Sequence, residues 1–342
     1  MATTTDGAPG GFSRAAASYD DAVRHNIAGS RRLVMSLPDG DHARVLDVGC
    51  GTGFTSMEML RRFDVTTLVG VDPAEGMLDV FAAKLAAFPA VEVDLRAEGV
   101  MEMEVEDGGF DTVISAMALH WFPDKPAAVA RMARALRPGG LMGVLTAGRG
   151  GEDAWREVLE RVGAPPAWTG WFAHNQRDVD EIAADMRAAG LEPLDVWMER
   201  RRRATPPEAF MARTRAVAGH LLANPPGGFS DLDRRIEAGL HSAAGPDGFV
   251  YDYCKLFAVA RRPASRTIAR GGTWMRRTRR DPRRPSSSTG GSPSWGTGAG
   301  RPWRGCARSC GRPIRTRSGS GGGSPPGRTA GSSAPGRRTE TR

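Results

Sequence analysis

The sequence predicts an α/β fold built on a doubly wound, mostly parallel sheet of seven strands. Between residues 44 and 147, short apolar runs alternate with amphipathic segments of helical period. The apolar runs lack polar alternation, as expected for strands that are covered on both faces. Alternation of this kind favours parallel strands joined by right-handed crossovers.

The elements are expected in chain order as follows. One or two helices occupy 13–37. Strands are expected at 44–49, 66–72, 91–97, 110–117 and 141–147, and helices at 55–63, 74–88 and 125–137. Two further strands, 192–201 and 249–262, flank helical stretches at about 206–223 and 230–243. We expect this helical insertion before the last strand, about 203–246, to cover a site as a lid.

Composition divides the chain into a leader (1–12), a folded body (13–262) and a tail (263–342). The whole chain holds 47 basic and 39 acidic residues, but residues 261–342 hold 20 Arg, no Lys and two acids. The remaining body is therefore acidic, at −10. The tail is rich in Arg, Gly, Ser and Pro and poor in aliphatic residues, so we expect it to be disordered. Its composition is typical of GC-rich coding DNA read out of frame; the alternative is a functional basic tail.

The ends of the chain and its cysteines favour a cytoplasmic protein without a membrane span. The first 16 residues contain no apolar signal region, and no run approaches the roughly 18 apolar residues of a membrane helix. Four scattered cysteines do not predict a disulfide framework. Cys306 and Cys310 lack a second pair and a nearby histidine, so we predict no metal site.

A glycine-rich turn with an internal carboxylate follows the first strand. The segment VLDVGCGTGF places Asp47 before Gly49, Gly51 and Gly53. Glycines at such a turn permit positive φ and close ligand approach, and ligands of open α/β sheets lie at this edge. The third glycine comes one residue too early for a dinucleotide fingerprint, and a pyrophosphate would be repelled by Asp47. The pattern therefore favours a cationic ligand.

This segment resembles motif I of class I S-adenosylmethionine-dependent methyltransferases, a family with a Rossmann-like fold. The resemblance implies that S-adenosyl-L-methionine is the cofactor, that Asp47 faces its ammonium group and that the glycine backbone lies against its methionine part. Asp72, which ends the second strand, would accept the ribose hydroxyls. Met77 would pack on adenine, with simple core packing as the alternative.

Later segments extend the resemblance to about residues 10–262. After the third strand, where the family often has an acid, this chain has Arg96; the resemblance leaves the Ala97 amide and Glu98 to meet adenine. Residues 110–124, including Ser115, resemble the fourth motif of the small-molecule branch, which includes trans-aconitate and malonyl-carrier-protein O-methyltransferases. Tyr19 would fold over the cofactor.

His120 is the candidate general base, because it follows the fourth strand and imidazole titrates near neutral pH. Its alternative role is packing beside Trp121. A base is needed only when the acceptor carries a proton, and a carboxylate acceptor does not.

Other residues have weaker indications. Cys50 is expected to be a small filler in the turn. Aromatic residues after the fifth strand would either line an acceptor pocket or form the core of the lid; they are Trp155, Trp168, Trp171 and Phe172. The arginine run 200–203 is expected to be a solvated strand end, or else to hold an acidic substrate. His25 and His220 are expected to be surface or lid residues.

The sequence favours methyl transfer to a small-molecule acceptor, with oxygen of a carboxylate or hydroxyl group as the accepting atom. Two alternatives are an RNA- or protein-directed methyltransferase with a basic tail and a non-catalytic cofactor-binding protein. Nucleic acid would be a partner only through the tail. The segment Ser115–Met117 lacks the Asn/Asp-Pro-Pro-aromatic motif of enzymes that methylate base amino groups.

Overall fold

The computed structural model describes residues 8–170, 174–218 and 229–264. The described residues belong to one unit, Met1–Gly272. Most of the predicted tail lies outside them, as do Trp171, Phe172 and His220.

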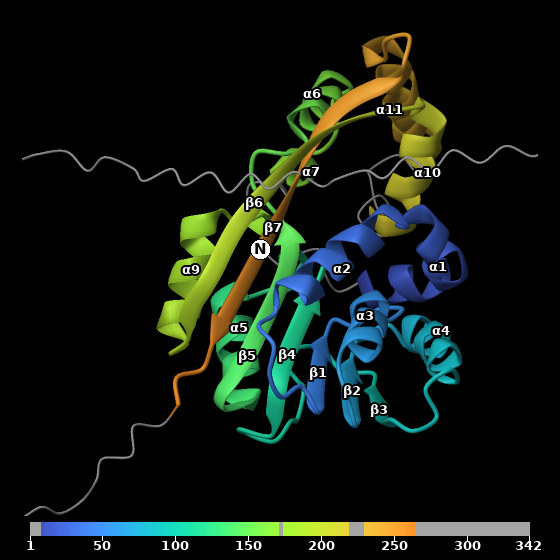
Figure 1. Ribbon diagram of the computed structural model, residues 1–342. Helices are drawn as coiled ribbons and strands as arrows, with labels where there is room; N and C mark the ends of the chain where they lie inside the picture. Colours follow the sequence, from blue (N-terminus) through green and yellow to red (C-terminus); the bar gives the residue numbers. More distant parts are fainter. Residues whose placement is uncertain (1–7, 171–173, 219–228, 265–342) are drawn as a thin grey trace, which may run out of the picture. The chain divides into compact units, whose positions relative to one another are not determined.

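The unit is built on a seven-stranded sheet with the order β3-β2-β1-β4-β5-β7-β6 (Figure 1). The strands are β1 (Arg44–Val48), β2 (Thr67–Val71), β3 (Glu92–Arg96), β4 (Phe110–Ala116), β5 (Leu136–Ala147), β6 (Glu192–Thr205) and β7 (Phe249–Arg261). The first five pair in parallel, whereas β7 runs antiparallel to both β5 and β6. The strand order reverses between β1 and β4, and ligands of open α/β sheets bind outside such a point. The predicted doubly wound, mostly parallel sheet is therefore confirmed.

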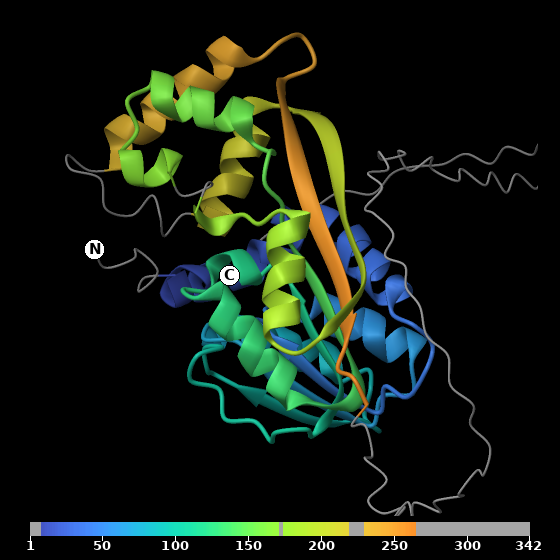
Figure 2. The ribbon, with the colours of Figure 1, turned by 90° about the vertical axis from the view of Figure 1, so that its left-hand side faces the viewer.

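Helices connect the strands and cover both faces of the sheet (Figures 1 and 2). The helices before β5 are α1 (Ala8–Ala22), α2 (His25–Ser36), α3 (Phe54–Arg62), α4 (Glu75–Leu85), the short η1 (Leu119–Trp121) and α5 (Lys125–Ala135). Those after β5 are α6 (Asp153–Arg161), α7 (Pro166–Thr169), α9 (Val179–Ala188), α10 (Pro207–Ala218) and α11 (Phe229–Ala243).

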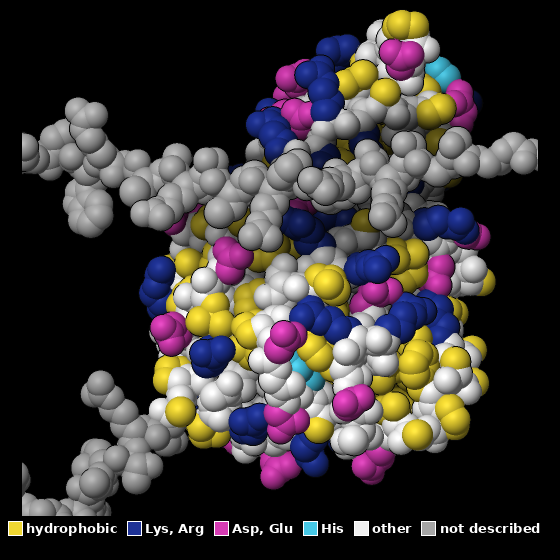
Figure 3. Space-filling view, viewed as in Figure 1, with side chains coloured by type: hydrophobic (Ala, Val, Ile, Leu, Met, Phe, Trp, Pro, Cys, Tyr) yellow, Lys and Arg dark blue, Asp and Glu magenta, His cyan; other side chains and the backbone are white. Residues whose placement is uncertain are grey.

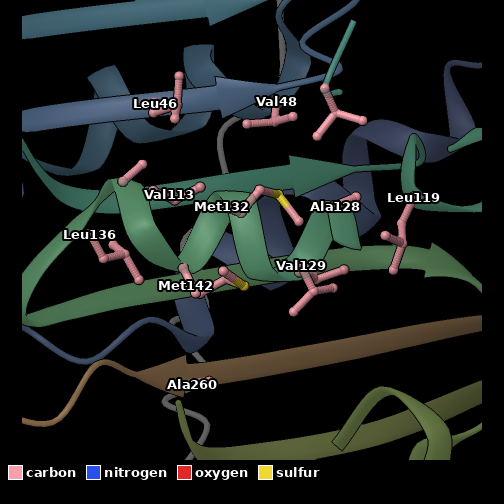
Figure 4. Packing of buried hydrophobic residues seen from close by; sticks show 14 of the residues in the cluster. Leu46, Val48, Val113, Leu119, Ala128, Val129, Met132, Leu136, Met142 and Ala260 are labelled. Carbon is pink, nitrogen blue, oxygen red and sulfur yellow. The ribbon is translucent and has the colours of Figure 1, made fainter. Parts of the chain in front are cut away.

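The sheet is buried between two apolar layers. On one face, α5 packs on β4 and β5, with Ala128 and Met132 over Leu46, Val113 and neighbouring strand residues, and α9 packs beside it on β6 and β7 (Figure 4). On the other face, α2, α3 and α4 supply a second core around Leu33, Met59 and Phe81. Because both faces are covered, the strands need apolar side chains in both directions, which explains their unbroken apolar runs.

A third core lies in the part that follows β5. It joins α6, α10 and α11 to the outer end of β7 through Trp155, Phe210, Leu232, Ile236 and Tyr251. Figure 2 shows these helices gathered at one end of the β6–β7 pair. Trp155 on α6 therefore packs in the core that α6 shares with the insertion, which is close to one of the two roles expected for it.

The structure corrects several predicted boundaries. Strand β5 begins at Leu136 instead of 141, and helix α5 ends at Ala135 instead of 137. Helix α1 begins at Ala8, inside the segment expected to be a flexible leader. Phe12 makes edge-on ring contacts with Tyr19 and Trp121, and these contacts give the first turns a tertiary anchor. Strand β6 continues to Thr205, beyond its expected end at 201, because it stays paired with β7 up to Phe249.

No helix in the described ranges is long and apolar enough to cross a membrane. Cys50 and Cys254 are both buried free thiols.

Removing a central core side chain should cost much of the stability of the sheet. Leu46 is fully buried in β1, so Leu46→Ala should lower the free energy of unfolding by about 2–5 kcal/mol through lost apolar burial and a residual cavity. Leu194 on β6 is 38% exposed, and Leu194→Ala should change it by less than about 0.5 kcal/mol. Chemical denaturation of both variants provides the measurement; equal losses would contradict this assignment of the core.

Candidate functional site

The glycine turn after β1 has the backbone conformation that its sequence predicts. Gly49, Gly51 and Gly53 have φ angles of 69°, 52° and 83°, all in the left-handed region. A Cβ on Gly49 would collide with Ala118, and one on Gly53 with the ring of Phe81. A Cβ on Gly51 would meet nothing within 4 Å, and Gly51 lines a cavity. Two of the glycines therefore permit close packing, and the third keeps the turn open toward a ligand.

Hydrogen bonds fasten this turn to the end of β2. The Gly49 and Cys50 amides both donate to the Val71 carbonyl, at 2.8 and 3.1 Å. The Gly51 amide donates to Asp72 Oδ2 at 2.9 Å. The turn and the carboxylate that follows β2 are thus held as one rigid edge.

Asp47 is a buried carboxylate at the C-terminal end of β1. It is 1% exposed, and Ser56 Oγ donates to its Oδ2 at 2.6 Å. Burial raises the pKa of Asp47 to about 7, with a further contribution from the charge of Asp72 and partial opposition from the Ser56 hydrogen bond. A buried anion is stabilised by a nearby cation, so this position favours a positively charged group.

Asp72 is oriented by two backbone donors. Its Oδ1 accepts the Ala74 amide at 2.9 Å, and its Oδ2 accepts Gly51. Burial raises its pKa, while the two backbone hydrogen bonds lower it. Each carboxylate oxygen keeps a further lone pair for a ligand donor.

Both carboxylates line a cavity of about 450 Å³ at the point where the strand order reverses. The turn contributes Gly49, Gly51 and their neighbours, and α1 contributes Phe12 and Tyr19. The acidic side chains in its described lining are Asp47, Asp72 and Glu102, and this lining contains no Lys, Arg or His. The cavity therefore suits a ligand that carries positive charge.

Hydrogen bonds and an ion pair hold helix α1 against the glycine turn. Thr52 Oγ1 donates to Asp20 Oδ1 at 2.6 Å, while Lys84 on α4 pairs with Asp20 at 2.5 Å and donates to the Thr52 carbonyl at 2.7 Å. Tyr19, the neighbour of Asp20, is thereby held against the cavity, and burial raises the pKa of its phenol.

At the far end of the cavity, the structure brings together different residues from those expected. Met77 lines the cavity and is 2% exposed. Ala97 and Glu98 do not belong to the lining; Gly99–Glu102, the next four residues, do. The Glu98 carboxylate instead accepts the Glu104 amide at 3.2 Å. The chain therefore reaches the cavity only at Gly99, after the two residues that were expected to contact adenine.

Ser115 and His120 are also outside the lining. Ser115 is fully buried within β4, and its Oγ has no hydrogen-bond partner among the described residues. His120 is 5% exposed, and its Nδ1 lies 3.2 Å from Thr146 Oγ1. Burial, and then the charge of Lys125, lower the His120 pKa to about 3. An imidazole in this environment is neutral at physiological pH and packs behind Trp121, which does line the cavity.

Sequence reasoning missed Asn26 on α2. This side chain is 8% exposed and lines the cavity, and its Oδ1 has no hydrogen-bond partner among the described residues. Ser30, one turn later, lines the same wall. The helical pattern of α2 identifies a polar residue at position 26 but not the direction that it faces, so the sequence carried no usable signal.

These features fit S-adenosylmethionine. The ligand carries a sulfonium and an ammonium group, and the cavity offers buried Asp47 and the Asn26 Oδ1 atom, which has no hydrogen-bond partner within the described ranges. Its ribose hydroxyls match the oriented carboxylate of Asp72. The open Gly51 backbone leaves room for close approach. Within the described ranges, no group of three or more His, Cys, Asp or Glu side chains could hold a metal.

The two unlike glycines allow a direct test of the turn. Gly53→Ala should destabilise more than Gly51→Ala: both impose left-handed backbone strain of about 1–2 kcal/mol, but only Gly53→Ala adds a collision with Phe81. Thermal and chemical denaturation measure the difference. Equal destabilisation would contradict the packing role of Gly53.

Asp47 should make the stability of the ligand-free chain depend on pH. Because its folded-state pKa is raised from 3.8 to about 7, the stability present below about pH 4 is lost as pH rises through 7. Asp47→Asn should remove this loss and stabilise the chain at about pH 8 by on the order of 2–4 kcal/mol. Urea unfolding at about pH 5 and pH 8 measures it. A variant no more stable than the parent chain at the higher pH would refute the buried-anion assignment.

Comparison with known proteins agrees with this geometry. Residues 45–140 match the model of a methyltransferase domain. The chain is 35% identical over 117 residues to trans-aconitate 2-methyltransferase of Deinococcus radiodurans, covering 34% of this chain and 43% of the relative. It is 36% identical over 151 residues to malonyl-[acyl-carrier protein] O-methyltransferase of Serratia marcescens, covering 43% and 56%. The chain thus spans about half the length of these curated relatives.

Among solved structures, phosphoethanolamine N-methyltransferase 2 of Haemonchus contortus, in complex with S-adenosyl-L-methionine, has a TM-score of 0.44. The identity is 20%, over 70% of this chain and 52% of that one. Residues 45–140 of this chain, which match the methyltransferase domain model, begin in β1. They contain the glycine turn, the buried carboxylates Asp47 and Asp72, and the point where the strand order reverses. The chain therefore contains a methyltransferase domain over residues 45–140 and is similar to S-adenosylmethionine-dependent methyltransferases.

Proposed function

We propose that this chain transfers a methyl group from S-adenosyl-L-methionine to an oxygen of a small-molecule acceptor. The observation that carries the proposal is one cavity, lined by Asp47, Asp72 and Glu102 without a described basic side chain, at the reversal of strand order. The names of the curated relatives give trans-aconitate as the acceptor of one and an oxygen of malonyl-[acyl-carrier protein] as that of the other.

Each part of the cavity has a role in holding this cofactor. Asp47 and Asn26 would bind the ammonium end. Asp72 would accept the ribose hydroxyls with the lone pairs that Gly51 and Ala74 leave available. Met77 would pack on the adenine ring, while the Glu102 carboxylate lies at the same end of the cavity as Gly99.

When bound, the cofactor supplies a methyl group that is already activated by its positive sulfur. The protein therefore has to align the acceptor and keep water out. Phe12, Tyr19, Trp121 and Phe122 line the cavity and supply apolar walls for this purpose. Helix α1 and the insertion pack together through α10, and we propose that they act as a lid.

The cavity favours an acceptor that needs no general base. Its described lining holds no histidine or lysine, and His120 lies outside it with a pKa near 3. A carboxylate acceptor is already ionised at neutral pH and satisfies this constraint. Among oxygen acceptors, the geometry thus favours a carboxylate over a hydroxyl group.

The direct test of the function is transfer of labelled methyl from S-adenosylmethionine to panels of carboxylates, phenols, amines and RNA. We expect a carboxylate or another oxygen acceptor to be labelled. Labelling of RNA alone would overturn the small-molecule proposal, and binding of NAD in place of S-adenosylmethionine would overturn the function.

Cofactor binding should depend on Asp72 and not on Glu98. Asp72→Ala should weaken binding of S-adenosylhomocysteine by about 1–3 kcal/mol, the scale of hydrogen bonds to a charged group. Glu98→Gln should leave it unchanged, because this carboxylate is outside the cavity lining. Titration calorimetry measures both. Equal affinity of the parent chain and Asp72→Ala would remove the ribose assignment, and a loss in Glu98→Gln would restore the contact expected from the sequence.

A further inference from the structure

Strands β6 and β7 extend beyond the rest of the sheet as a two-stranded ribbon. The pairing of β5 with β7 ends at Ala147 and Lys255, whereas β6 and β7 stay paired from there to Thr205 and Phe249. The four arginines 200–203 lie on this ribbon, on the edge strand β6. Figure 3 shows Lys and Arg side chains interspersed with Asp and Glu side chains on the upper part of the molecule.

Successive side chains of a strand point to opposite faces, so the arginine run divides into two pairs. Arg201 is opposite Tyr253 in the register, and Glu199 is opposite Lys255. The guanidinium carbon of Arg203 lies 5.1 Å from the centre of the Tyr253 ring. Arg201, Arg203 and Lys255 therefore share one face of the ribbon.

Arg200 and Arg202 occupy the opposite face. Arg200 pairs with Asp252 at 3.1 Å, and Asp252 lies opposite Arg202 in the register. The two faces carry the same number of arginines but differ in their neighbours.

The face with Lys255 meets helix α2. Lys255 Nζ is 2.9 Å from the place that a Cβ on Gly29 would take. Arg32, on the next turn of α2, pairs with Glu199 at 2.5 Å. Glu199 also pairs with Arg201, at 3.1 Å, so one carboxylate is shared by two guanidinium groups.

Positive charge is concentrated on this face. Lys255 is 7% exposed, and burial and the charges of Arg203 and Arg201, in that order, lower its pKa to about 8. Glu199 opposes this shift. The fold thus holds cations near one another with partial compensation, an arrangement that an anion would stabilise.

Charged residues on an edge strand also hinder edge-to-edge pairing with other chains. That role accounts for arginines at all four positions. It does not account for a nearly buried lysine on the face that also holds Arg201 and Arg203, because an inward-facing lysine is poorly placed to repel another strand.

Helix α2 separates this cationic face from the cavity. Asn26 and Ser30 face the cavity, while Gly29 and Arg32 face the ribbon. The cavity is acidic in its described lining, so a negatively charged group of the acceptor other than the one that receives the methyl is disfavoured inside it and favoured on the ribbon side of α2.

We propose that Arg201, Arg203 and Lys255 form a binding site for a carboxylate or phosphate group carried by the methyl acceptor. Arginine forks bind either group with two parallel hydrogen bonds, and the lysine adds a point charge. The assignment of this site to the methyl acceptor rests on the proposed function, whereas the proposal that the site binds an anion does not.

The two faces of β6 provide a matched test. Binding of citrate and of inorganic phosphate is measured by titration calorimetry at constant ionic strength. Arg201→Gln/Arg203→Gln should weaken anion binding by about tenfold or more, as expected for loss of charge-assisted hydrogen bonds. Arg200→Gln/Arg202→Gln removes the same charge from the same strand and should leave the affinity within about twofold.

Equal weakening in the two double variants would show a general charge effect and overturn the proposal, as would failure of the parent chain to bind either anion. Tighter binding of citrate would assign the site to carboxylates, and tighter binding of phosphate to phosphate groups. Arg201→Lys/Arg203→Lys keeps the charge without the guanidinium forks and should retain part of the anion affinity. This variant replaces Arg201→Gln/Arg203→Gln in the test if the glutamine substitutions impair folding.

Binding of S-adenosylhomocysteine separates this proposal from the function. We expect all the ribbon variants to bind it as the parent chain does, because none of the substituted residues lines the cavity. A parent chain that binds citrate or phosphate but not S-adenosylhomocysteine would refute the proposed function and leave the anion site standing. A parent chain that binds S-adenosylhomocysteine but neither anion would refute the anion site alone.

Discussion

The hydrogen bonds between the glycine turn and the end of β2 are the constraint on which the site depends. The carbonyl of Val71 accepts two amides of the turn, and Asp72 accepts a third. These bonds fix the distance between the ends of β1 and β2, so Asp47 and Asp72 converge on one cavity. They need a backbone that bends through positive φ, which is why glycine residues occupy the turn.

Charge separation is the second organising feature. The cavity gathers carboxylates that are costly to ionise without a cation, since burial raises the pKa of both Asp47 and Asp72. The β6–β7 ribbon gathers cations, and burial lowers the pKa of Lys255. Each region would be stabilised by a ligand of opposite charge. A cationic methyl donor and an anionic acceptor would therefore be sorted to the two sides of α2 before they meet.

Much of the fold and the central part of the site could be predicted from the sequence. Unbroken apolar strands and helical periods indicated a parallel sheet, and the spacing of Asp47 and the glycines indicated the turn. Those signals are local, because each depends on residues that are close in the chain. Met77, which follows β2 by a short, regular connection, lines the cavity, and its contact with adenine stays a prediction.

The other site residues could not be predicted, because the direction in which a side chain faces depends on tertiary packing. The local sequence pattern does not encode this direction. His120 follows β4 at the edge where substrate is expected, yet the η1 turn points it toward Thr146, behind Trp121. Glu98 follows β3 as an acid should, but its carboxylate caps the Glu104 amide instead of facing the cavity. Asn26 lies in a helix whose orientation is set by packing on the sheet, so its role emerged only from the structure.

Helix α1 links the two ends of this arrangement. Through Asp20 it is tied to Thr52 in the glycine turn, and through its packing on α10 it contacts the insertion. The insertion in turn is joined to the ribbon, because Arg213 on α10 donates to the hydroxyl of Tyr251 on β7. A displacement of α1 that opened the cavity would therefore have to break the Asp20 contacts and shift α10 against the ribbon. Access of the donor and placement of the acceptor would then be coupled through contiguous packing, with α1 as the shared element.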